Sequence, residues 1–159
     1  MLQADTMRPA IRLARDTDIE AIAALVAHYW DFENIPGFER SRTVTLLAEF
    51  LARSERGHCW VAEIEGGLIG YLLVVLVFSL EHGGLMAEID ELFVVPEKRS
   101  LAVGAALLSE ASQAMARDGI AQLQLQLAIN NPRAKHFYEE HGFRPLSGYA
   151  LWQKSLNSR

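Results

Sequence analysis

The sequence predicts a mixed α/β (α+β) fold, with a mixed central sheet of six to seven strands flanked by about four helices. The 159 residues and 50% hydrophobic content suit one ordinary domain spanning 1–159, with 1–10 as a frayed lead-in. Stretches of alternating polarity are interspersed with stretches in which apolar residues recur every three to four positions. The predicted order is strand, helix, helix, three strands, helix, strand, helix, strand.

The first third of the chain is predicted to form a short strand and two helices. Residues 11–15 alternate apolar and charged side chains, and the Asp-Thr-Asp sequence at 16–18 has helix N-cap chemistry. A helix follows from residue 19 to about residue 30, because its apolar residues share one face. A second helix is expected over about 41–53 for the same reason.

The middle of the chain is predicted to form three strands. Residues 58–65 and 67–80 flank a turn at Gly66-Gly67, which indicates an antiparallel hairpin. The second of these strands is very apolar, but its 14 residues fall short of the roughly 20 that a membrane-spanning helix needs. A strand covered on both faces is expected instead. Residues 86–95 form the next strand, which Pro96 ends.

The last third begins with a helix over about 102–118, which Gly119 ends. Residues 121–128 alternate Gln and Leu strictly and are the clearest strand in the sequence, with leucines toward the core and glutamines toward something polar. A helix over about 132–141 and a strand over 149–155 complete the pattern.

Composition disfavours several classes of function. The net charge is -5 and the basic residues are scattered, so binding to a nucleic-acid backbone is not expected. The single cysteine, Cys59, cannot form an internal disulfide or a metal cluster, and no metal-ligand spacing appears. A cytoplasmic protein without a metal, a membrane segment or a nucleic-acid partner is therefore the expectation.

The central strand-turn-helix unit is the first candidate for a binding site. A strand ends at Pro96, and after a short loop a helix begins with Val103 and Gly104. The first N–H groups of a helix have no internal partner and sit at the positive end of its dipole, so they favour a phosphate. Arg99 can add a charge-assisted contact. Taken alone, such a loop is more often structural than phosphate-binding.

Two motifs in this region resemble the GNAT superfamily of acyl-CoA N-acyltransferases. Val95-Pro96 followed by residues 99–104, RSLAVG, resembles its pyrophosphate motif. A second block, 30 or so residues on, resembles the family's Asn-x-x-Ala-x-x-Phe-Tyr-Glu-x-x-Gly-Phe. It is carried here by Asn131, Ala134, Phe137, Tyr138, Glu139, Gly142 and Phe143. The resemblance covers about 11–156 and implies the GNAT fold, acetyl-CoA as cosubstrate, and transfer of an acetyl group to a primary amine by direct attack.

One position departs from the pattern, since the first motif glycine is Ala102 here. An alanine costs little if the backbone keeps a negative φ, but its methyl group obstructs if φ must be positive or if a phosphate must approach closely. Acetyl-CoA binding is the expectation most exposed to this change.

The resemblance implies a set of residues that bind acetyl-CoA. The backbone of the strand before the loop would pair with the pantetheine arm as an added strand would. The loop and the start of the next helix would hold the pyrophosphate, and the second block would contribute two further residues. The implied cofactor-binding residues are Phe93, Val94, Val95, Arg99, Ser100, Leu101, Ala102, Val103, Gly104, Ala105, Asn131 and Tyr138.

The resemblance also implies catalytic roles. Tyr138 matches the general acid that protonates the departing thiolate. An ammonium substrate must lose a proton, and the strand 86–95 offers Glu88, Asp90 and Glu91. Alternation places Glu88 and Asp90 on one face and Glu91 on the other. The family pattern points to Asp90 as the base or the anchor of a water relay, with solvated acidic decoration as the alternative for each of the three.

The amine site is expected beside the two N-terminal helices, with Tyr29, Trp30 and Glu88 as substrate-binding residues, although aromatic residues at such spacing are more often core. A backbone N–H near Val94 would polarise the acyl carbonyl. The substrate is a small-molecule or peptide amine of unspecified identity. Proteins of this family are often dimers, so a homodimer is left open.

Three other functions are compatible with the sequence. A CoA-binding sensor or inactive relative would keep the fold and lose the reaction, as Ala102 suggests. A different nucleotide-binding α/β protein is disfavoured, because the loop lacks a full glycine-rich fingerprint and a following Lys-Ser or Lys-Thr. An interaction module would bind no CoA ester.

Overall fold

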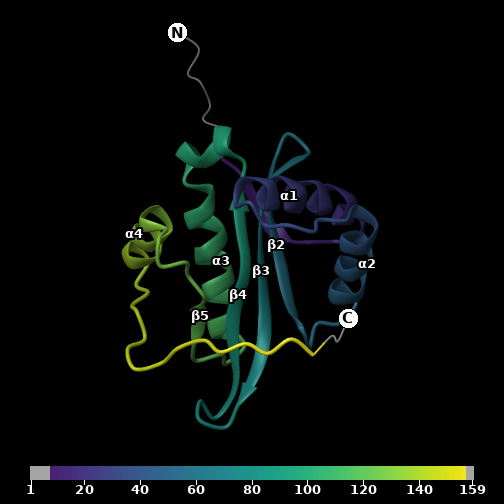
Figure 1. The fold of residues 1–159 in the computed structure, drawn as a ribbon. Helices are drawn as coiled ribbons and strands as arrows, with labels where there is room; N and C mark the ends of the chain where they lie inside the picture. The colour runs from purple at the N-terminus through teal and green to yellow at the C-terminus, as the bar shows by residue number, and fades with distance from the viewer. Residues whose placement is uncertain (1–7, 157–159) are drawn as a thin grey trace. The chain divides into compact units, whose positions relative to one another are not determined.

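The computed structural model describes residues 8–156, and the chain divides into two compact units between Gln126 and Leu127. The described residues of the first unit form three α-helices, two short 3-10 helices (Asp16–Asp18 and Pro96–Leu101) and five strands, and those of the second form one α-helix. Figure 1 labels the α-helices and strands. The expectation of one domain over 1–159 stays a prediction, and residues 1–7 of the lead-in lie outside the described residues. The elements are β1 (Ala10–Leu13), α1 (Ile19–Phe32), α2 (Arg40–Leu51), β2 (Gly57–Ile64), β3 (Gly67–Ser79), β4 (Gly84–Val94), α3 (Val103–Arg117), β5 (Leu123–Leu125) and α4 (Pro132–Glu140).

The strands form one mixed sheet in the order β1-β2-β3-β4-β5. Strands β1 to β4 pair with one another in antiparallel fashion, and β5 pairs parallel with β4. The expected hairpin is confirmed, but its turn lies at Glu65 and Gly66, one residue earlier than predicted. Both have positive φ, 51° and 78°, which a tight two-residue hairpin turn favours. The mixed sheet and four α-helices agree with the prediction for the described residues.

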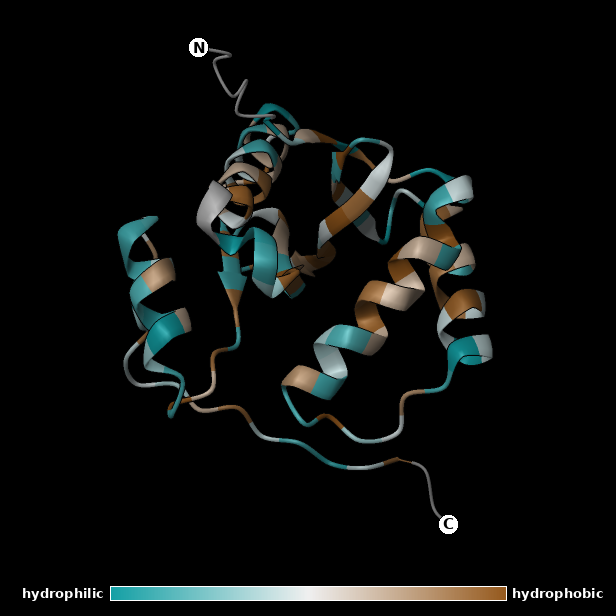
Figure 2. Cartoon of the chain, turned by 90° about the horizontal axis from the view of Figure 1, so that it is seen from above, coloured by the Kyte–Doolittle hydropathy of each residue, from teal (hydrophilic) through white to brown (hydrophobic). Residues whose placement is uncertain are grey.

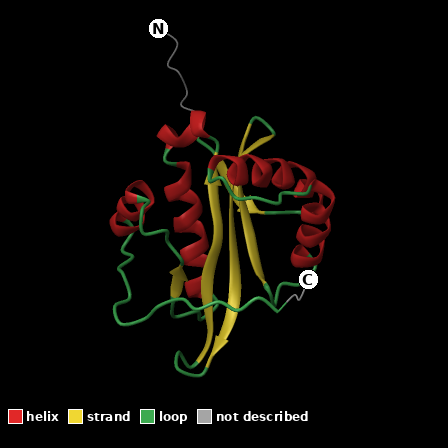
Figure 3. Ribbon diagram, viewed as in Figure 1, coloured by secondary structure: helices red, strands yellow, loops and turns green. Residues whose placement is uncertain are grey.

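The expectation of six to seven strands was wrong for residues 8–156, which form five. Residues 149–155 carry no regular secondary structure, and Figure 3 draws the chain after α4 as loop. The run of Gln and Leu forms a strand only at Leu123–Leu125. A strand exists only where its backbone pairs with a neighbour, and side-chain alternation cannot supply that neighbour.

The sheet of the first unit is buried on both faces, since the consecutive residues Val61 and Ala62 are both fully inaccessible. One face packs on α1 and α2 through a buried cluster that includes Ile22, Leu47 and Tyr71. The other face is covered by α3, whose buried residues recur every three to four positions. Viewed from above in Figure 2, hydrophobic and hydrophilic residues alternate along these helices. The candidate site lies at the carboxyl-terminal part of β4, which carries the acidic residues Glu88, Asp90 and Glu91.

Candidate active site

A β-bulge interrupts β4 at Asp90. Leu73 on β3 stands opposite Glu91, and the next residue, Val74, stands opposite Ile89. Two residues of β4 therefore occupy the space of one, and Asp90 is the residue without a partner on β3. Bulges of this kind redirect a side chain, so Asp90 interrupts the regular alternation of side chains between the two faces of the sheet.

The bulge also corrects the expected distribution of the acidic side chains. Glu88 stands opposite Val75 and Glu91 opposite Leu73. Residues directly opposite each other share a face, and positions two apart on β3 share a face as well. Glu88 and Glu91 therefore lie on the same face of the sheet. The prediction that Glu91 faces away from Glu88 was wrong, because it assumed unbroken alternation through Asp90.

Glu88 is held in place by two glutamines. Its Oε2 atom accepts a hydrogen bond from Gln124 Nε2 at 2.6 Å, and its Oε1 atom accepts one from Gln126 Nε2 at 3.2 Å. Gln124 is also its register partner on β5. The expected polar partner of the alternating glutamines is thus the Glu88 carboxylate.

Glu91 is held by two other donors. Its Oε1 atom accepts from Trp30 Nε1 at 2.8 Å, and its Oε2 atom accepts from the Tyr71 hydroxyl at 2.6 Å. Burial raises the pKa of Glu91, the bonds from Tyr71 and Trp30 oppose that rise, and the Asp90 charge adds to it. The sequence pattern missed this cluster. The available signal was a single tyrosine inside an apolar strand, since a buried hydroxyl needs a partner.

Asp90 differs from both neighbours. No hydrogen bond or ion pair joins its carboxylate to another described residue. Part of its side chain remains exposed, yet the surrounding protein withdraws enough water to raise its pKa, and the nearby Glu88 charge raises the pKa further. Asp90 is therefore a carboxylate that accepts no hydrogen bond from the described residues and has an increased affinity for a proton.

The aromatic side chains at the end of α1 lie beside these carboxylates. Tyr29 is half-buried, with its ring centre 5.7 Å from that of Phe93. Burial, followed by the charges of Glu91, Glu33 and Asp90, raises the pKa of Tyr29 to about 12, so its hydroxyl stays protonated near neutral pH. The structure thus brings Tyr29 and Trp30, two of the expected substrate-binding residues, next to the acidic part of β4.

The edge of β4 opposite β3 is open beyond the bulge. β5 pairs only with Ala87–Ile89, so residues 90–94 have no strand partner on that edge within the described chain. The Val95 N–H donates to Ile69 O on β3 at 2.9 Å. Successive residues of a strand direct their N–H and C=O groups to opposite edges, so the Val94 N–H points to the open edge. Of Phe93, Val94 and Val95, whose backbone is expected to pair with the pantetheine arm, Val94 is the residue whose N–H faces the open edge. The pairing itself stays a prediction.

Arg99 connects the loop after β4 to the end of α1. Its Nε atom donates to Val94 O at 3.0 Å. Its guanidinium lies 4.6 Å from the Phe32 ring centre and 5.6 Å from that of Phe93. These contacts give Arg99 a structural role that the sequence did not reveal, and its expected contact with a phosphate stays a prediction.

Ala102 has the left-handed conformation, with φ 54° and ψ 28°, immediately before α3. Of the two cases considered for alanine in place of the motif glycine, the structure shows the unfavourable one, a positive φ. A non-glycine residue in this conformation costs roughly 1–2 kcal/mol. The N-cap residue Ala102 makes no side-chain hydrogen bond to α3, and among the side chains that the structure describes none is recorded as capping this helix, so the first-turn N–H groups, at residues 103–105, are available to an anion. The side chains of Ser100 and Leu101 lie outside the described residues.

The second unit contains the other two expected site residues. Tyr138 on α4 has ring contacts with Phe137 and Phe143, at 5.1 Å and 5.3 Å between centres. Asn131 caps the same helix, and its Oδ1 atom accepts from Ala134 N at 3.1 Å. The side-chain oxygen of Asn131 thus has a structural task, and the functional roles of both residues stay predictions.

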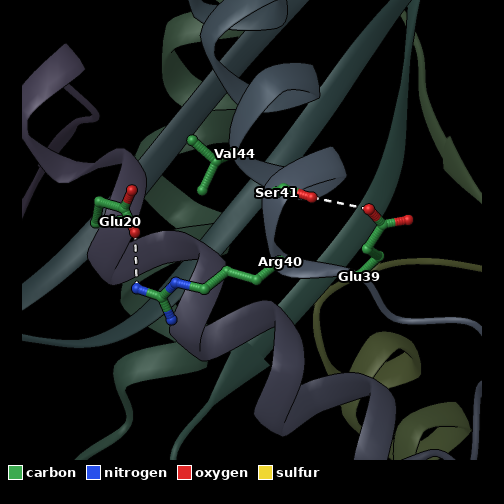
Figure 4. A pocket seen from close by; sticks show the side chains of 5 residues that line it. All are labelled: Glu20, Glu39, Arg40, Ser41 and Val44. Atoms are coloured by element: carbon green, nitrogen blue, oxygen red, sulfur yellow. Dashed lines mark hydrogen bonds and ion pairs between the residues drawn. The ribbon is translucent and has the colours of Figure 1, made fainter.

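A surface pocket lies elsewhere in the first unit, between α1 and the start of α2 (Figure 4). Its lining residues are joined by an ion pair from Arg40 to Glu20 at 2.7 Å and by a hydrogen bond from the Ser41 hydroxyl to Glu39 at 2.8 Å. It contains none of the predicted site residues. Within residues 8–156 there is no cluster of metal-binding side chains and no helix suited to crossing a membrane.

The open edge of β4 followed by an uncapped helix start suits an extended molecule that carries a phosphate. The profile of the acetyltransferase (GNAT) family matches residues 9–143. The chain belongs to this family. As a GNAT protein it is an acetyl-CoA-dependent N-acetyltransferase, and the resemblance seen in its two motifs is confirmed.

Individual relatives agree with the family assignment. The GNAT chain is 29% identical over 142 residues to YhfO, an uncharacterised N-acetyltransferase of Bacillus subtilis (strain 168), with 87% of this chain and 92% of the relative covered. It is 24% identical over 150 residues to a thialysine N-epsilon-acetyltransferase of Bos taurus, covering 89% and 88%. A CoA-bound aminoglycoside N-acetyltransferase, AAC(6')-Iy, superposes with a TM-score of 0.80 at 17% identity, covering 92% and 95%, and supports the fold.

Proposed function

We propose that this GNAT protein transfers the acetyl group of acetyl-CoA to a primary amine by direct attack, with Asp90 as the base and Tyr138 as the general acid. The observation that carries the proposal is the position of Asp90. It is the unpartnered residue of the β4 bulge, its pKa is raised, and it directly precedes the open edge of the strand.

Asp90 suits proton acceptance better than either neighbouring carboxylate. A substrate ammonium with a pKa near 10.4 must lose a proton before it can attack, at a cost of roughly 4–5 kcal/mol at pH 7. Glu88 and Glu91 each accept two hydrogen bonds from the protein, whereas Asp90 accepts none from the described residues. Its raised pKa narrows the gap to the substrate, and a bridging water can complete the transfer.

The reaction forms one bond and breaks one. The neutral amine nitrogen attacks the thioester carbonyl carbon and forms the amide C–N bond. The C–S bond then breaks, and the electron pair leaves with sulfur. The ammonium passes its first proton to Asp90 before the attack, and Asp90 releases it to solvent. As the tetrahedral intermediate collapses, the nitrogen loses its second proton to solvent water, the Tyr138 hydroxyl supplies a proton to the thiolate, and the tyrosinate regains a proton from solvent. The Val94 N–H, which faces the open edge, would stabilise the oxygen of the tetrahedral intermediate.

The arrangement also supports the class of acceptor. Tyr29 and Trp30 present aromatic surface beside acidic side chains, which suits a cationic amine with an apolar body. Two of the similar proteins are named for amine substrates, thialysine and aminoglycosides. The acceptor-binding role therefore falls to Tyr29, Trp30 and Glu88, while acetyl-CoA lies along Val94 and the start of α3.

A thiol-release assay with acetyl-CoA and a panel of primary amines tests the proposal. We expect at least one amine to release CoA, Asp90→Asn and Tyr138→Phe to lower kcat by about 10²-fold or more, and Tyr149→Phe to leave kcat unchanged. Tyr149 is a suitable control because it is 73% exposed and belongs to the same unit as Tyr138. Normal turnover by Asp90→Asn across the pH range would reject Asp90 as the base.

The alternative, a CoA-binding protein without transferase activity, is favoured by one observation, the left-handed Ala102. Its methyl group stands where the family motif has a glycine. Calorimetry separates the two functions: binding of acetyl-CoA without thiol release from any amine would support the sensor, and turnover would exclude it.

A further inference from the structure

The Glu91 carboxylate joins three elements of the first unit. Both of its oxygens accept short hydrogen bonds, one from Trp30 on α1 and one from Tyr71 on β3. Tyr71 is fully buried, so its hydroxyl cannot exchange this partner for water. Glu91 itself directly follows the bulge residue Asp90. One side chain therefore connects the end of α1 to the bulge.

Trp30 transmits this connection to the chain beyond α1. Its ring packs edge-on against Phe38, with 6.1 Å between ring centres. Phe38 belongs to the segment between α1 and α2. The Trp30 indole carries a single N–H donor, and Glu91 accepts its hydrogen bond, so the orientation of the ring is fixed by the carboxylate.

We propose that Glu91 is a positioning residue for the binding of the amine acceptor. Glu91 holds Trp30 and the end of α1 at a set distance from Asp90, and it takes no part in proton transfer. The inference rests on the proposed function, because it concerns the acceptor side of that same site. Under this proposal the two adjacent carboxylates have different roles: Asp90 accepts the proton, and Glu91 anchors Trp30 through a hydrogen bond.

The donors explain why Glu91 is the anchor. An incoming proton on either oxygen would disturb a bond of 2.6 Å or 2.8 Å, and the indole N–H cannot reverse to act as an acceptor. Loss of the carboxylate would also leave the buried Tyr71 hydroxyl without its partner. Asp90 has neither constraint.

Substitutions at Glu91 and Trp30 distinguish the effect of the hydrogen bonds made by the Glu91 side chain from the effect of its negative charge. In Glu91→Gln, the amide oxygen can accept from Trp30 while the amide nitrogen donates to the Tyr71 oxygen, so both links persist without the negative charge. We expect Glu91→Ala and Trp30→Phe to raise the KM for the amine by about tenfold, with a smaller effect on kcat, and Glu91→Gln to restore the KM lost in Glu91→Ala. Trp152→Phe, at a 90% exposed site, is the matched control.

The pH profile gives a second readout. An anchor does not titrate with the reaction, so the acid limb of kcat/KM should stay in place in Trp30→Phe, which keeps all three carboxylates. In Glu91→Gln the limb should persist and move to lower pH, because the Glu91 and Asp90 charges repel each other, whereas Asp90→Asn should remove the limb. Loss of turnover in Glu91→Gln as severe as in Asp90→Asn would overturn the proposal, and so would an unchanged amine KM in Trp30→Phe.

The anchor can also be observed without turnover. The chain has three tryptophans, so 15N-labelled protein should give three indole N–H signals, and Trp30→Phe identifies the one of interest. We expect this signal to exchange slowly in the wild type and in Glu91→Gln, and at least tenfold faster in Glu91→Ala. If no amine releases thiol, the proposed function fails while this measurement still decides whether Glu91 anchors Trp30. Equal exchange in all three proteins would reject the anchor.

Discussion

The guanidinium carbon of Arg99 lies 4.6 Å from the centre of the Phe32 ring, which joins the loop after β4 to the last residue of α1. The same side chain donates to Val94 O. The loop expected to hold the pyrophosphate and the helix expected to border the amine are thus in direct contact. The two halves of the proposed site share a structural support within the first unit.

Replacing Phe32 by leucine should weaken this support. Leucine keeps an apolar side chain but removes the ring face, so we expect the free energy of unfolding to fall by about 0.5–1 kcal/mol in urea titrations. Phe78→Leu is the control, because Phe78 is also exposed, at 68% against 52% for Phe32, and no cation among the described residues lies over its ring. Equal losses in both variants would show that the Arg99 contact contributes nothing measurable.

Ala102→Gly should stabilise the protein. Glycine adopts the left-handed conformation of Ala102 without a Cβ clash, and this gain exceeds the added entropy of the unfolded chain, so we expect about 0.5–1 kcal/mol of extra stability. Ala114→Gly inside α3 should instead cost about 1 kcal/mol. The affinity for acetyl-CoA, measured by calorimetry, should stay equal or increase in Ala102→Gly. Weaker binding would mean that the methyl group contributes to the cofactor site.

The pH dependence of turnover should respond to Glu88. Burial and the Glu88 charge raise the pKa of Asp90, so kcat/KM falls as the pH drops through that raised value. Glu88→Gln removes the charge and lowers the pKa of Asp90, and the acid limb should move to lower pH. Glu81→Gln, in an exposed loop, should leave the limb in place. A limb that stays fixed in Glu88→Gln would exclude Asp90 as the titrating group.

The ion pairs of Arg12 should make stability fall in acid. Arg12 donates to Asp18 at 2.7 Å and to Glu63 at 2.7 Å, and its bonds lower the pKa of the buried Asp18. A carboxylate with a lowered folded-state pKa stabilises the protein above its unfolded pKa, near 3.9, and this contribution is lost as the pH falls through the folded value.

Asp18→Asn tests this link in urea titrations. At pH 7 it should lose about 1.5–3 kcal/mol relative to the wild type, and the difference should shrink as the pH falls below about 4. The exposed neighbour Asp16 provides the control, since Asp16→Asn should change stability little at either pH. A difference between Asp18→Asn and the wild type that persists unchanged in acid would exclude the ion pair as its source.

Much of the architecture followed from local patterns. Apolar spacing predicted α1, α2 and α3, and a helix was also expected over about 132–141, where α4 lies; each helix forms its hydrogen bonds within its own segment. Strand pairing is different, because the partner comes from elsewhere in the chain. Residues 149–155 alternate in part yet form no strand in the described structure, and the Gln and Leu run pairs over only three residues.

The sequence by itself determined the family, the class of reaction and the segment that carries the acidic residues, because these depend on motifs of fixed spacing and on composition. Only the tertiary structure shows that Glu88 and Glu91 each accept two hydrogen bonds from the protein, which supports the proposal of Asp90 as the base. The bulge at Asp90 is defined only by the register between β3 and β4, and it moved Glu91 onto the face of Glu88. The donors that occupy Glu91 come from Trp30 and Tyr71, 61 and 20 positions away. A contact over that distance in sequence leaves no local signature, and it gives adjacent acidic residues different chemistry.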